Sequence, residues 1–414
     1  MTVVTERTEF TQPYPGIRPF RKSEWPIFFG RDRMIDAVMD KLAKCQFVLL
    51  HGTSGCGKSS LVKAGLLPRL EMSHYGHDIA WSTAQMRPGG APLWNFAEVL
   101  ARIIEGLEDD QIPSFDMVRK VRRRLNLGIK ALPALAEEFG IGKTGNVCLL
   151  IDQFEEIFRF AAEIERSEVD MLIEVLRVFE SDPPRGIHVI ATMRSDFLGD
   201  CAKFVGFAEV INETQYLLPR LEQTELMESI IRPAELFDGE VEIELALRLI
   251  DESRDEADAL PLVQHCLMYL WNRASDEQSE QIKLGLDGYL GLKQTLSQRA
   301  DEVLEELEAS SPGASKSAEH LFRAVVAQDA SGRATRRPVR RSVLQDICAS
   351  SSSDLDLYIE RFSDPDTGFL LLSQDDDPIV DITHESLIRC WDRLSGTDQY
   401  SAGKRGWLQR ERDD

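Results

Sequence analysis

The chain has 414 residues and a formal net charge of −22 at pH 7. This length allows two or three domains, and a composition that is 43% hydrophobic and 8% aromatic excludes a largely disordered chain. The acidic balance argues against a general nucleic-acid-binding protein, because phosphate backbones would be repelled unless a basic face is segregated. No run of about 18 apolar residues occurs, so the sequence predicts no transmembrane helix and no membrane association.

The seven cysteines are scattered and form no Cys-x-x-Cys pair. This distribution argues against a zinc site and against a disulfide framework. No apolar run follows a basic N-terminus, so no secretory signal is visible. We therefore expect a reducing, cytoplasmic location.

Residues 1–15 are polar, contain Pro13 and Pro15, and are expected to form an extended lead-in. From residue 16 to about 194, short apolar segments alternate with segments of helical period, which is typical of a parallel sheet covered by helices. The expected strands are 45–50, 79–82, 147–151 and 187–192, and the expected helices are 60–67, ending near Pro68, 91–105 and 167–179. These segments indicate an α/β domain.

Beyond the last strand the apolar periodicity is helical. Residues 221–271 show only helical periods, with breaks at Pro233 and Pro261, and predict a small helical domain. Helical segments at 292–307, 318–327 and 342–348 then precede two short apolar pieces, 368–372 and 379–382, and helices followed by a two-stranded hairpin are the pattern of a winged helix. The predicted domains are a lead-in at 1–15, the α/β domain at 16–215, a helical lid domain at 216–278, a winged-helix domain at 279–396 and a charged tail at 397–414.

The segment from Gly52 to Ser59 matches the phosphate-binding loop at every defined position: a glycine, four free residues, then Gly-Lys-Ser. Glycines let the backbone N–H groups wrap a triphosphate, and the following helix adds its positive dipole end. Lys58 is expected to reach the phosphates and Ser59 to bind Mg²⁺. An apolar segment enters the loop and a helical one leaves it, so we expect nucleotide contacts from Gly52, Thr53, Ser54, Gly55, Cys56, Gly57, Lys58, Ser59 and Ser60.

A phosphate-binding loop predicts a second strand that ends in a carboxylate for Mg²⁺. Residues 147–151 are apolar and Asp152 follows them, so Asp152 is the expected metal ligand beside Ser59. Glu155 or Glu156 could orient or deprotonate the attacking water. The alternative is that these glutamates merely begin a helix, where acidic residues suit the helix dipole; we favour a catalytic role for at least one of them.

Arg194 follows the third expected strand. If that strand adjoins the strand before the phosphate-binding loop, the guanidinium of Arg194 can reach the γ-phosphate and distinguish ATP from ADP. A salt bridge with Asp196 or another acid is the structural alternative, and the sequence leaves the two interpretations open.

Several further motifs occur in order along the chain and together resemble the bacterial novel STAND NTPases, relatives of the NACHT and apoptotic-type signalling ATPases. They are Pro15-Gly16-Ile17-Arg18-Pro19-Phe20, Phe28-Phe29-Gly30-Arg31, the acids Asp152, Glu155 and Glu156, Thr192-Met193-Arg194, Leu260-Pro261-Leu262, and Asp381-Ile382-Thr383-His384-Glu385-Ser386-Leu387. The match spans about residues 15–394. The resemblance implies a P-loop NTPase domain with an AAA-like parallel sheet, followed by the helical and winged-helix domains.

The resemblance also implies roles for individual residues. Phe29, Gly30 and Arg31 would lie near the adenine and ribose, and Pro261 would pack on the nucleotide. His384 would hydrogen-bond the β-phosphate of ADP and lock a closed resting state. Without the resemblance, His384 would more often be a core or surface histidine than a ligand.

The implied activity is a slow regulatory ATPase that uses ATP or ADP with Mg²⁺. ADP would hold the domains closed, and exchange for ATP would open them and permit homo-oligomerisation, as in defence or stress signalling. No sensor or effector module is recognisable, so these parts are supplied by separate polypeptides or the chain is an excised module.

Three other functions are weighed against this one. The first is a nucleotide-bound scaffold that does not hydrolyse ATP. The second is a DNA-binding winged helix that uses the basic cluster at 332–341, and the third is a phosphate-loop kinase, for which no acceptor site is recognisable. For the basic run at 119–124, a solvated helix face is favoured over a nucleic-acid patch because no aromatic residues interleave it. Nucleic acid is therefore not an expected partner.

Overall fold

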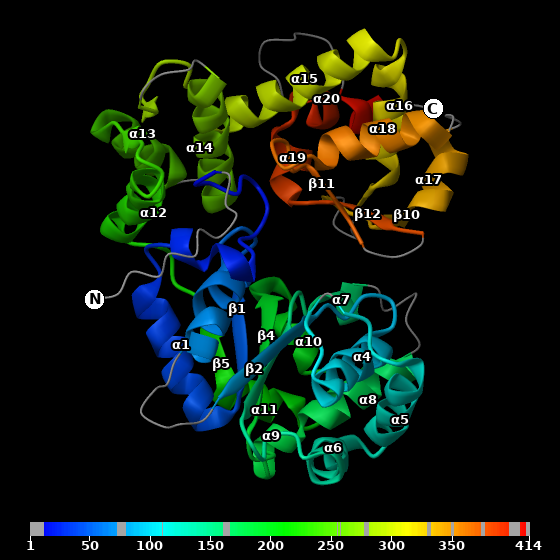
Figure 1. The fold of residues 1–414 in the computed structure, drawn as a ribbon. Coiled ribbons are helices and arrows are strands. Elements are labelled where there is room, and N and C mark those ends of the chain that lie inside the picture. Colours follow the sequence, from blue (N-terminus) through cyan, green and yellow to red (C-terminus); the bar gives the residue numbers. More distant parts are fainter. Residues whose placement is uncertain are drawn as a thin grey trace. The chain divides into compact units, whose positions relative to one another are not determined.

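The computed structural model describes residues 12–72, 80–109, 111–159, 166–254, 256, 258–276, 281–328, 333–348, 352–373, 377–396 and 406–410 (Figure 1). The chain folds into two compact units. One is Phe20–Leu221, and the other combines Met1–Pro19 with Glu222–Asp414. Each unit is described by itself below.

The unit Phe20–Leu221 is built on a five-stranded sheet in the order β2-β3-β4-β1-β5, in which every neighbouring pair is parallel. Its carboxyl edge carries the ends of β1, β3 and β4, the three strands that precede the expected site residues. The strands are β1 (Phe47–Gly52), β2 (Trp81–Met86), β3 (Asn146–Ile151), β4 (Ile187–Arg194) and β5 (Gln215–Leu217).

Helices cover both faces of this sheet (Figure 1). Successive side chains of β1 enter opposite cores, because side chains alternate along a strand: Phe47 and Leu49 lie in one, Val48 and Leu50 in the other. The helices, in chain order, are η1 (Lys22–Ile27), α1 (Asp32–Cys45), α2 (Lys58–Ser60), the π-helical turn η2 (Leu61–Leu66), α3 (Leu67–Met72), α4 (Pro92–Glu105), α5 (Phe115–Leu125), η3 (Gly128–Lys130), α6 (Ala131–Phe139), α7 (Glu156–Arg159), α8 (Arg166–Leu176), α9 (Val178–Ser181), η4 (Ser195–Phe197), α10 (Leu198–Cys201) and α11 (Phe207–Thr214).

The predicted α/β class is confirmed, with differences in detail. The helix expected at 167–179 is divided into α8 and α9. The strand expected at 79–82 is Trp81–Met86, and residues 73–79 lie outside the described part of the chain. The helix expected to end near Pro68 continues to Met72, so that expectation was wrong. Pro68 is tolerated because it stands in the first turn of α3, directly after a π-turn in which the Leu67 N–H donates to Val62 O.

The second unit is mainly helical. It contains the three-stranded sheet β10-β12-β11 and the two-stranded pairs β6-β7 and β8-β9. Its elements are α12 (Gln223–Glu235), β6 (Glu240–Val241), α13 (Ile243–Ser253), α14 (Ala259–Asp276), β7 (Lys283–Leu284), α15 (Leu292–Ser310), α16 (Ala314–Ala324), β8 (Val326–Gln328), β9 (Ala334–Arg336), β10 (Val339–Arg340), α17 (Arg341–Cys348), α18 (Ser352–Ser363), β11 (Leu370–Leu372), β12 (Ile379–Ile382), α19 (Glu385–Cys390), α20 (Asp392–Ser395) and α21 (Trp407–Arg410).

Neither proline of the expected helical domain breaks a helix, contrary to the sequence analysis. Pro261 is the third residue of α14, where a backbone N–H has no intrahelical partner to lose. Pro233 lies in the last turn of α12, which continues to Glu235. The expected hairpin is present as antiparallel β11 and β12, and a further strand that was not expected, β10, pairs with β12.

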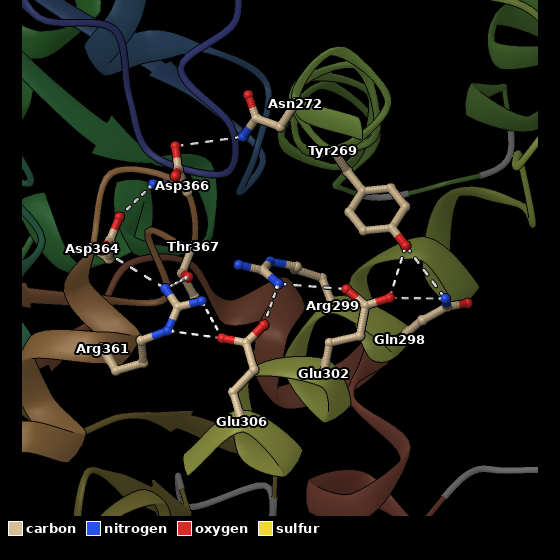
Figure 2. Close-up of polar contacts among 10 residues, drawn as sticks. All are labelled: Tyr269, Asn272, Gln298, Arg299, Glu302, Glu306, Arg361, Asp364, Asp366 and Thr367. Carbon is tan, nitrogen blue, oxygen red and sulfur yellow. Dashed lines mark hydrogen bonds and ion pairs between the residues drawn. The ribbon is translucent and has the colours of Figure 1, made fainter. Parts of the chain in front are cut away.

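A polar network joins α14, α15, α18 and the loop after α18 in this unit (Figure 2). Glu306 is its centre: its carboxylate accepts hydrogen bonds from Arg361 and from Arg299. Tyr269 donates to Glu302 at 2.8 Å, and Asn272 donates to Asp366 at 3.5 Å. The network therefore fixes α14, the helix that carries Pro261, to the segment that leads into β11.

Among the described residues, no helix is long and apolar enough to cross a membrane.

Candidate nucleotide-binding site

The loop from Gly52 to Ser59 connects the end of β1 to the start of α2, as the sequence analysis expected. Gly55 and Gly57 have φ angles of 69° and 92°, a left-handed conformation that residues with a Cβ rarely adopt. Gly57 stands directly before α2, so the loop turns sharply and presents a helix N-terminus at the carboxyl edge of the sheet. This arrangement binds phosphate groups through backbone N–H groups and the helix dipole.

The ammonium group of Lys58 lies against the loop backbone. Its Nζ donates to Gly52 O at 3.1 Å and to Thr53 O at 2.7 Å. A positive charge is thereby held over the turn where phosphates would be wrapped. Nζ also donates to Cys56 Sγ at 3.7 Å. A phosphate oxygen can replace either carbonyl oxygen as a partner of the ammonium group.

Ser59 and Asp152, the two expected metal ligands, lie together. Ser59 Oγ donates to Asp152 Oδ1 at 2.7 Å, and Asp152 is only 1% exposed. Thr192 on β4, the strand between β1 and β3, also donates to Asp152 Oδ1 at 2.7 Å. Hydroxyl and carboxylate oxygens are the hard ligands that Mg²⁺ prefers, and Mg²⁺ sites of this kind use one or two carboxylates with phosphates and water.

This donor set fits Mg²⁺ better than a metal that needs a full protein cage. Within the described residues no group of three or more His, Cys, Asp or Glu side chains could hold a metal ion. The residues that could hold Mg²⁺ are therefore Ser59 and Asp152, with nucleotide phosphates completing the coordination.

Two basic side chains face the other oxygen of Asp152. Lys63 Nζ lies 2.8 Å from Oδ2 and Arg87 Nε lies 3.9 Å from it. Burial by itself raises the pKa of Asp152, but the charges of Lys63 and Arg87 and the hydrogen bonds from Lys63 and Ser59 outweigh it and hold the pKa well below its usual range. Asp152 is therefore a carboxylate at neutral pH.

The two candidate catalytic acids have different surroundings. Glu155 is buried, and burial is the main cause that raises its pKa; its Oε2 accepts from the backbone N–H of Arg194 at 3.3 Å. Glu156 is the first residue of α7, and its Oε2 accepts from the N–H of Gly89 at 3.0 Å. Glu156 thus begins a helix, as in the alternative interpretation, whereas Glu155 has the raised pKa typical of an acid–base residue.

Arg194 is the last residue of β4, and β4 adjoins β1 as the sensor hypothesis requires. Its Nη2 lies 2.7 Å from Asp196 Oδ2, so in the structure its guanidinium forms the salt bridge that the alternative interpretation expected. Arg194 pairs with Gly52 at the ends of β4 and β1, so its guanidinium can exchange Asp196 for a phosphate group.

Arg31 contacts the phosphate-binding loop from outside. Its guanidinium, in a residue only 3% exposed, donates to Cys56 O at 2.6 Å and to Pro219 O at 3.0 Å. It therefore ties the loop to the segment that follows β5. Ser60, the last expected loop residue, accepts from the N–H of Phe20 at 3.2 Å, so its hydroxyl holds the N-terminal segment of the unit.

Pro261 and His384 lie in the other compact unit. His384 precedes α19 and caps it, since its Nδ1 accepts from the N–H of Ser386 at 3.2 Å. Its Nε2 is 4.0 Å from Oδ1 of Asp258, a buried carboxylate that also pairs with Arg389. Asp258 directly precedes α14, so this cluster connects the segment that carries Pro261 to the segment that carries His384.

Three residues at the carboxyl edge of the sheet were not expected from the sequence: Lys63, Arg87 and His51. Thr192 was expected only as part of the motif that contains Arg194. His51, on β1, lies 3.0 Å from Ser195 through Nδ1, and burial is the main cause that lowers its pKa. One signal could have identified Lys63, because it stands four residues after Ser59 and so shares its helix face. The others depend on the order of the strands.

Arginines of both basic clusters, 332–341 and 119–124, form salt bridges with acidic residues. Arg336 lies 2.8 Å from Asp381 and also donates to Ile382 O. In α5, Arg124 lies 2.8 Å from Glu138. The partly exposed salt bridge of Arg124 agrees with the solvated helix face expected for residues 119–124.

Comparison with known proteins identifies a family. The family model described as Novel STAND NTPase 1 matches residues 13–413. No curated protein matches the chain. Solved structures with a similar chain path include the Orc1 protein of Aeropyrum pernix in complex with DNA (13% identity, 89% of this chain and 93% of that chain, TM-score 0.46). Others are the ORC2 protein of Aeropyrum pernix in ADPNP–ADP complexes (13%, 93% and 95%, 0.45) and Cdc6p of Pyrobaculum aerophilum (10%, 92% and 94%, 0.42).

Proposed function

Because the chain belongs to the Novel STAND NTPase 1 family, we propose that it is a STAND-type molecular switch that binds and slowly hydrolyses ATP. ADP holds a closed state, and exchange for ATP permits homo-oligomerisation, in bacterial defence or signalling in the cytoplasm. One observation carries the nucleotide-binding part: Ser59, at the start of the helix after the phosphate-binding loop, contacts the buried carboxylate of Asp152 at 2.7 Å.

The residues of the Phe20–Leu221 unit divide the chemistry between them. Lys58 and the loop N–H groups bind the phosphates, and Ser59 and Asp152 hold the cation. A bound Mg²⁺ supplies positive charge to the phosphoryl oxygens. Glu155 orients or deprotonates the attacking water, supported by its burial and raised pKa. Arg194 exchanges Asp196 for the γ-phosphate.

The switch resides in residues of both units. Phe29, Gly30 and Arg31 line the nucleoside side of the site, Pro261 packs on the nucleotide and His384 donates to the β-phosphate of ADP. The position of His384 at the start of α19, beside Asp258, supports a role in which its imidazole exchanges partners. A ligand shifts such an equilibrium only by its difference in affinity for the two states.

The first test identifies the bound nucleotide. Freshly purified protein is denatured and the released nucleotide is separated by chromatography. We expect stoichiometric ADP from the wild type, none from Lys58→Ala, and wild-type ADP from the control Lys203→Ala, which changes an exposed lysine of the same unit. Nucleotide-free wild-type protein that also fails to bind added ATP would refute the proposal.

The second test measures self-association. Light scattering of the wild type in ADP and in a non-hydrolysable ATP analogue should give a larger mass with the analogue. His384→Ala should associate in ADP as well, because the closed state loses its phosphate contact. Equal masses in both nucleotides would contradict the switch and leave nucleotide binding intact.

A scaffold that binds nucleotide without hydrolysing it is the second candidate. It is favoured by the partners of the catalytic candidates: Arg194 pairs with Asp196, and Glu156 is bound to the N–H of Gly89. Phosphate release at high protein concentration separates the two functions. Hydrolysis that Glu155→Gln abolishes supports the ATPase, whereas tight ADP with no phosphate release supports the scaffold.

A DNA-binding winged helix is disfavoured, because Asp381 engages Arg336 at 2.8 Å. Duplex binding measured over a range of salt, with Arg336→Ala and Arg337→Ala as variants, tests it. We expect no salt-dependent binding by the wild type.

A further inference from the structure

The carboxylate of Asp152 has two different sides. Its Oδ1 accepts the hydroxyls of Ser59 and Thr192, both at 2.7 Å. Its Oδ2 faces Lys63 Nζ at 2.8 Å and Arg87 Nε at 3.9 Å. A buried carboxylate needs such partners, because an unpaired charge in a low-dielectric site is strongly unfavourable.

Lys63 reaches Asp152 because of its place in the helix after the loop. Ser59 and Lys63 stand four residues apart and therefore project from the same helix face. Lys63 lies in the π-helical turn η2, and its side chain is only 17% exposed, so its charge is poorly screened by water. The neighbouring lysine of the loop, Lys58, donates instead to Gly52 O and Thr53 O.

We propose that Lys63 is a positioning residue that competes with the divalent cation for Asp152 and thereby sets the cation affinity of the site. This rests on the proposed function, in which Asp152 holds the cation. Lys63 has two opposite effects. It holds the buried carboxylate in place, and its positive charge, 2.8 Å from Oδ2, repels a cation bound to the same group.

Because these two effects oppose each other, substitution of Lys63 tests the proposal. Lys63→Met keeps the aliphatic stem and removes the charge. Its Tm in EDTA should fall, while the MgCl₂ concentration that gives half of the Mg²⁺-dependent Tm rise, at a fixed saturating ADP concentration, should fall about tenfold. A purely structural lysine would lower the Tm and raise this Mg²⁺ midpoint, or leave it unchanged, when removed.

Two further variants complete the design. Lys63→Arg keeps the charge and should retain the wild-type Mg²⁺ midpoint. Arg87→Met removes the more distant charge, at 3.9 Å, and should shift the midpoint in the same direction by a smaller factor, which keeps the test available if Lys63→Met does not fold. Lys203→Met, an exposed lysine paired with Asp200, should change neither quantity and controls for loss of one positive charge.

The outcomes separate this inference from the proposed function. ADP binding that depends on Mg²⁺ in the wild type, with an unchanged or raised midpoint in Lys63→Met and Arg87→Met, overturns the inference alone. A wild type that binds no ADP overturns both. A Mg²⁺ midpoint that is lowered in Lys63→Met but equals the wild-type value in Lys63→Arg supports the competition.

Discussion

Thr192 is the residue whose substitution tests the geometry of the site most directly. Its hydroxyl donates to Asp152 Oδ1 at 2.7 Å and accepts from the N–H of Gln153 at 3.0 Å. Thr192 is buried, so water cannot replace either hydrogen bond. Thr192→Val removes both bonds with almost no change in side-chain shape.

The expected cost follows from those two bonds. A hydrogen bond to a charged group contributes about 1.5–3 kcal/mol, and a buried N–H left without a partner costs about 1–3 kcal/mol. Asp152 keeps its contacts with Ser59 and Lys63, so we expect a total in the lower part of the summed range, at about 2.5–4 kcal/mol. Thr192→Ser keeps the hydroxyl and loses one buried methyl group, for about 1 kcal/mol.

Urea denaturation gives the stability of each variant, and hydrogen exchange read by mass spectrometry over the peptide that contains Gln153 gives the local effect. In Thr192→Val this amide should exchange at least about tenfold faster than in Thr192→Ser. If the valine variant is as stable as the serine variant and exchange at Gln153 is unchanged, the hydroxyl contributes nothing and Asp152 is not held as the structure indicates.

Two further predictions concern one buried histidine and one packed glycine. Burial, and then the charge of Arg299, lowers the pKa of His265 from 6.5 to about 3. The unfolded chain therefore binds a proton that the folded chain does not, and between pH 6.5 and 5 the free energy of unfolding should fall by about 1.6 kcal/mol from this group. Urea denaturation at both pH values should show a smaller fall in His265→Leu, and an equal fall would refute the assignment. Gly65→Ala should lower the free energy of unfolding by about 1–3 kcal/mol, because the added Cβ would lie 2.6 Å from Ile35 Cδ1. Gly90 has open space around it, so Gly90→Ala should be nearly neutral. Thermal denaturation of both variants tests this difference.

The parts of the site that could be predicted are those encoded in contiguous residues. The apolar run at 47–50, shortly before Gly52, predicts a buried strand that enters a phosphate-binding loop, and five apolar residues followed by Asp152 predict the second strand. Both strands can be predicted from the local alternation of apolar strand segments with helical segments. Parallel strands bring their carboxyl ends to one edge, so the meeting of Ser59 and Asp152 could be expected from the motifs alone.

The parts that could not be predicted depend on strand order or on a local turn. The order β3-β4-β1 places Thr192 between the two site strands, and no local pattern determines that order. Glu155 and Glu156 are adjacent in sequence, yet one is buried and the other starts α7. Gln153, with a φ of 60°, turns the chain sharply after β3, and this left-handed turn sends the two acids to different surroundings.

The charges of the site show why affinity for nucleotide and cation cannot be read from the number of basic residues. Lys58 donates to carbonyl oxygens of the loop, Lys63 pairs with Asp152, and Arg194 pairs with Asp196. Each of these charges already has a partner within the protein, so binding exchanges one partner for another and the gain is only the difference between them. For that reason removal of one basic side chain can weaken the fold and strengthen a ligand contact together, and measurements of stability and of ligand affinity on the same variants are both needed to assign its role.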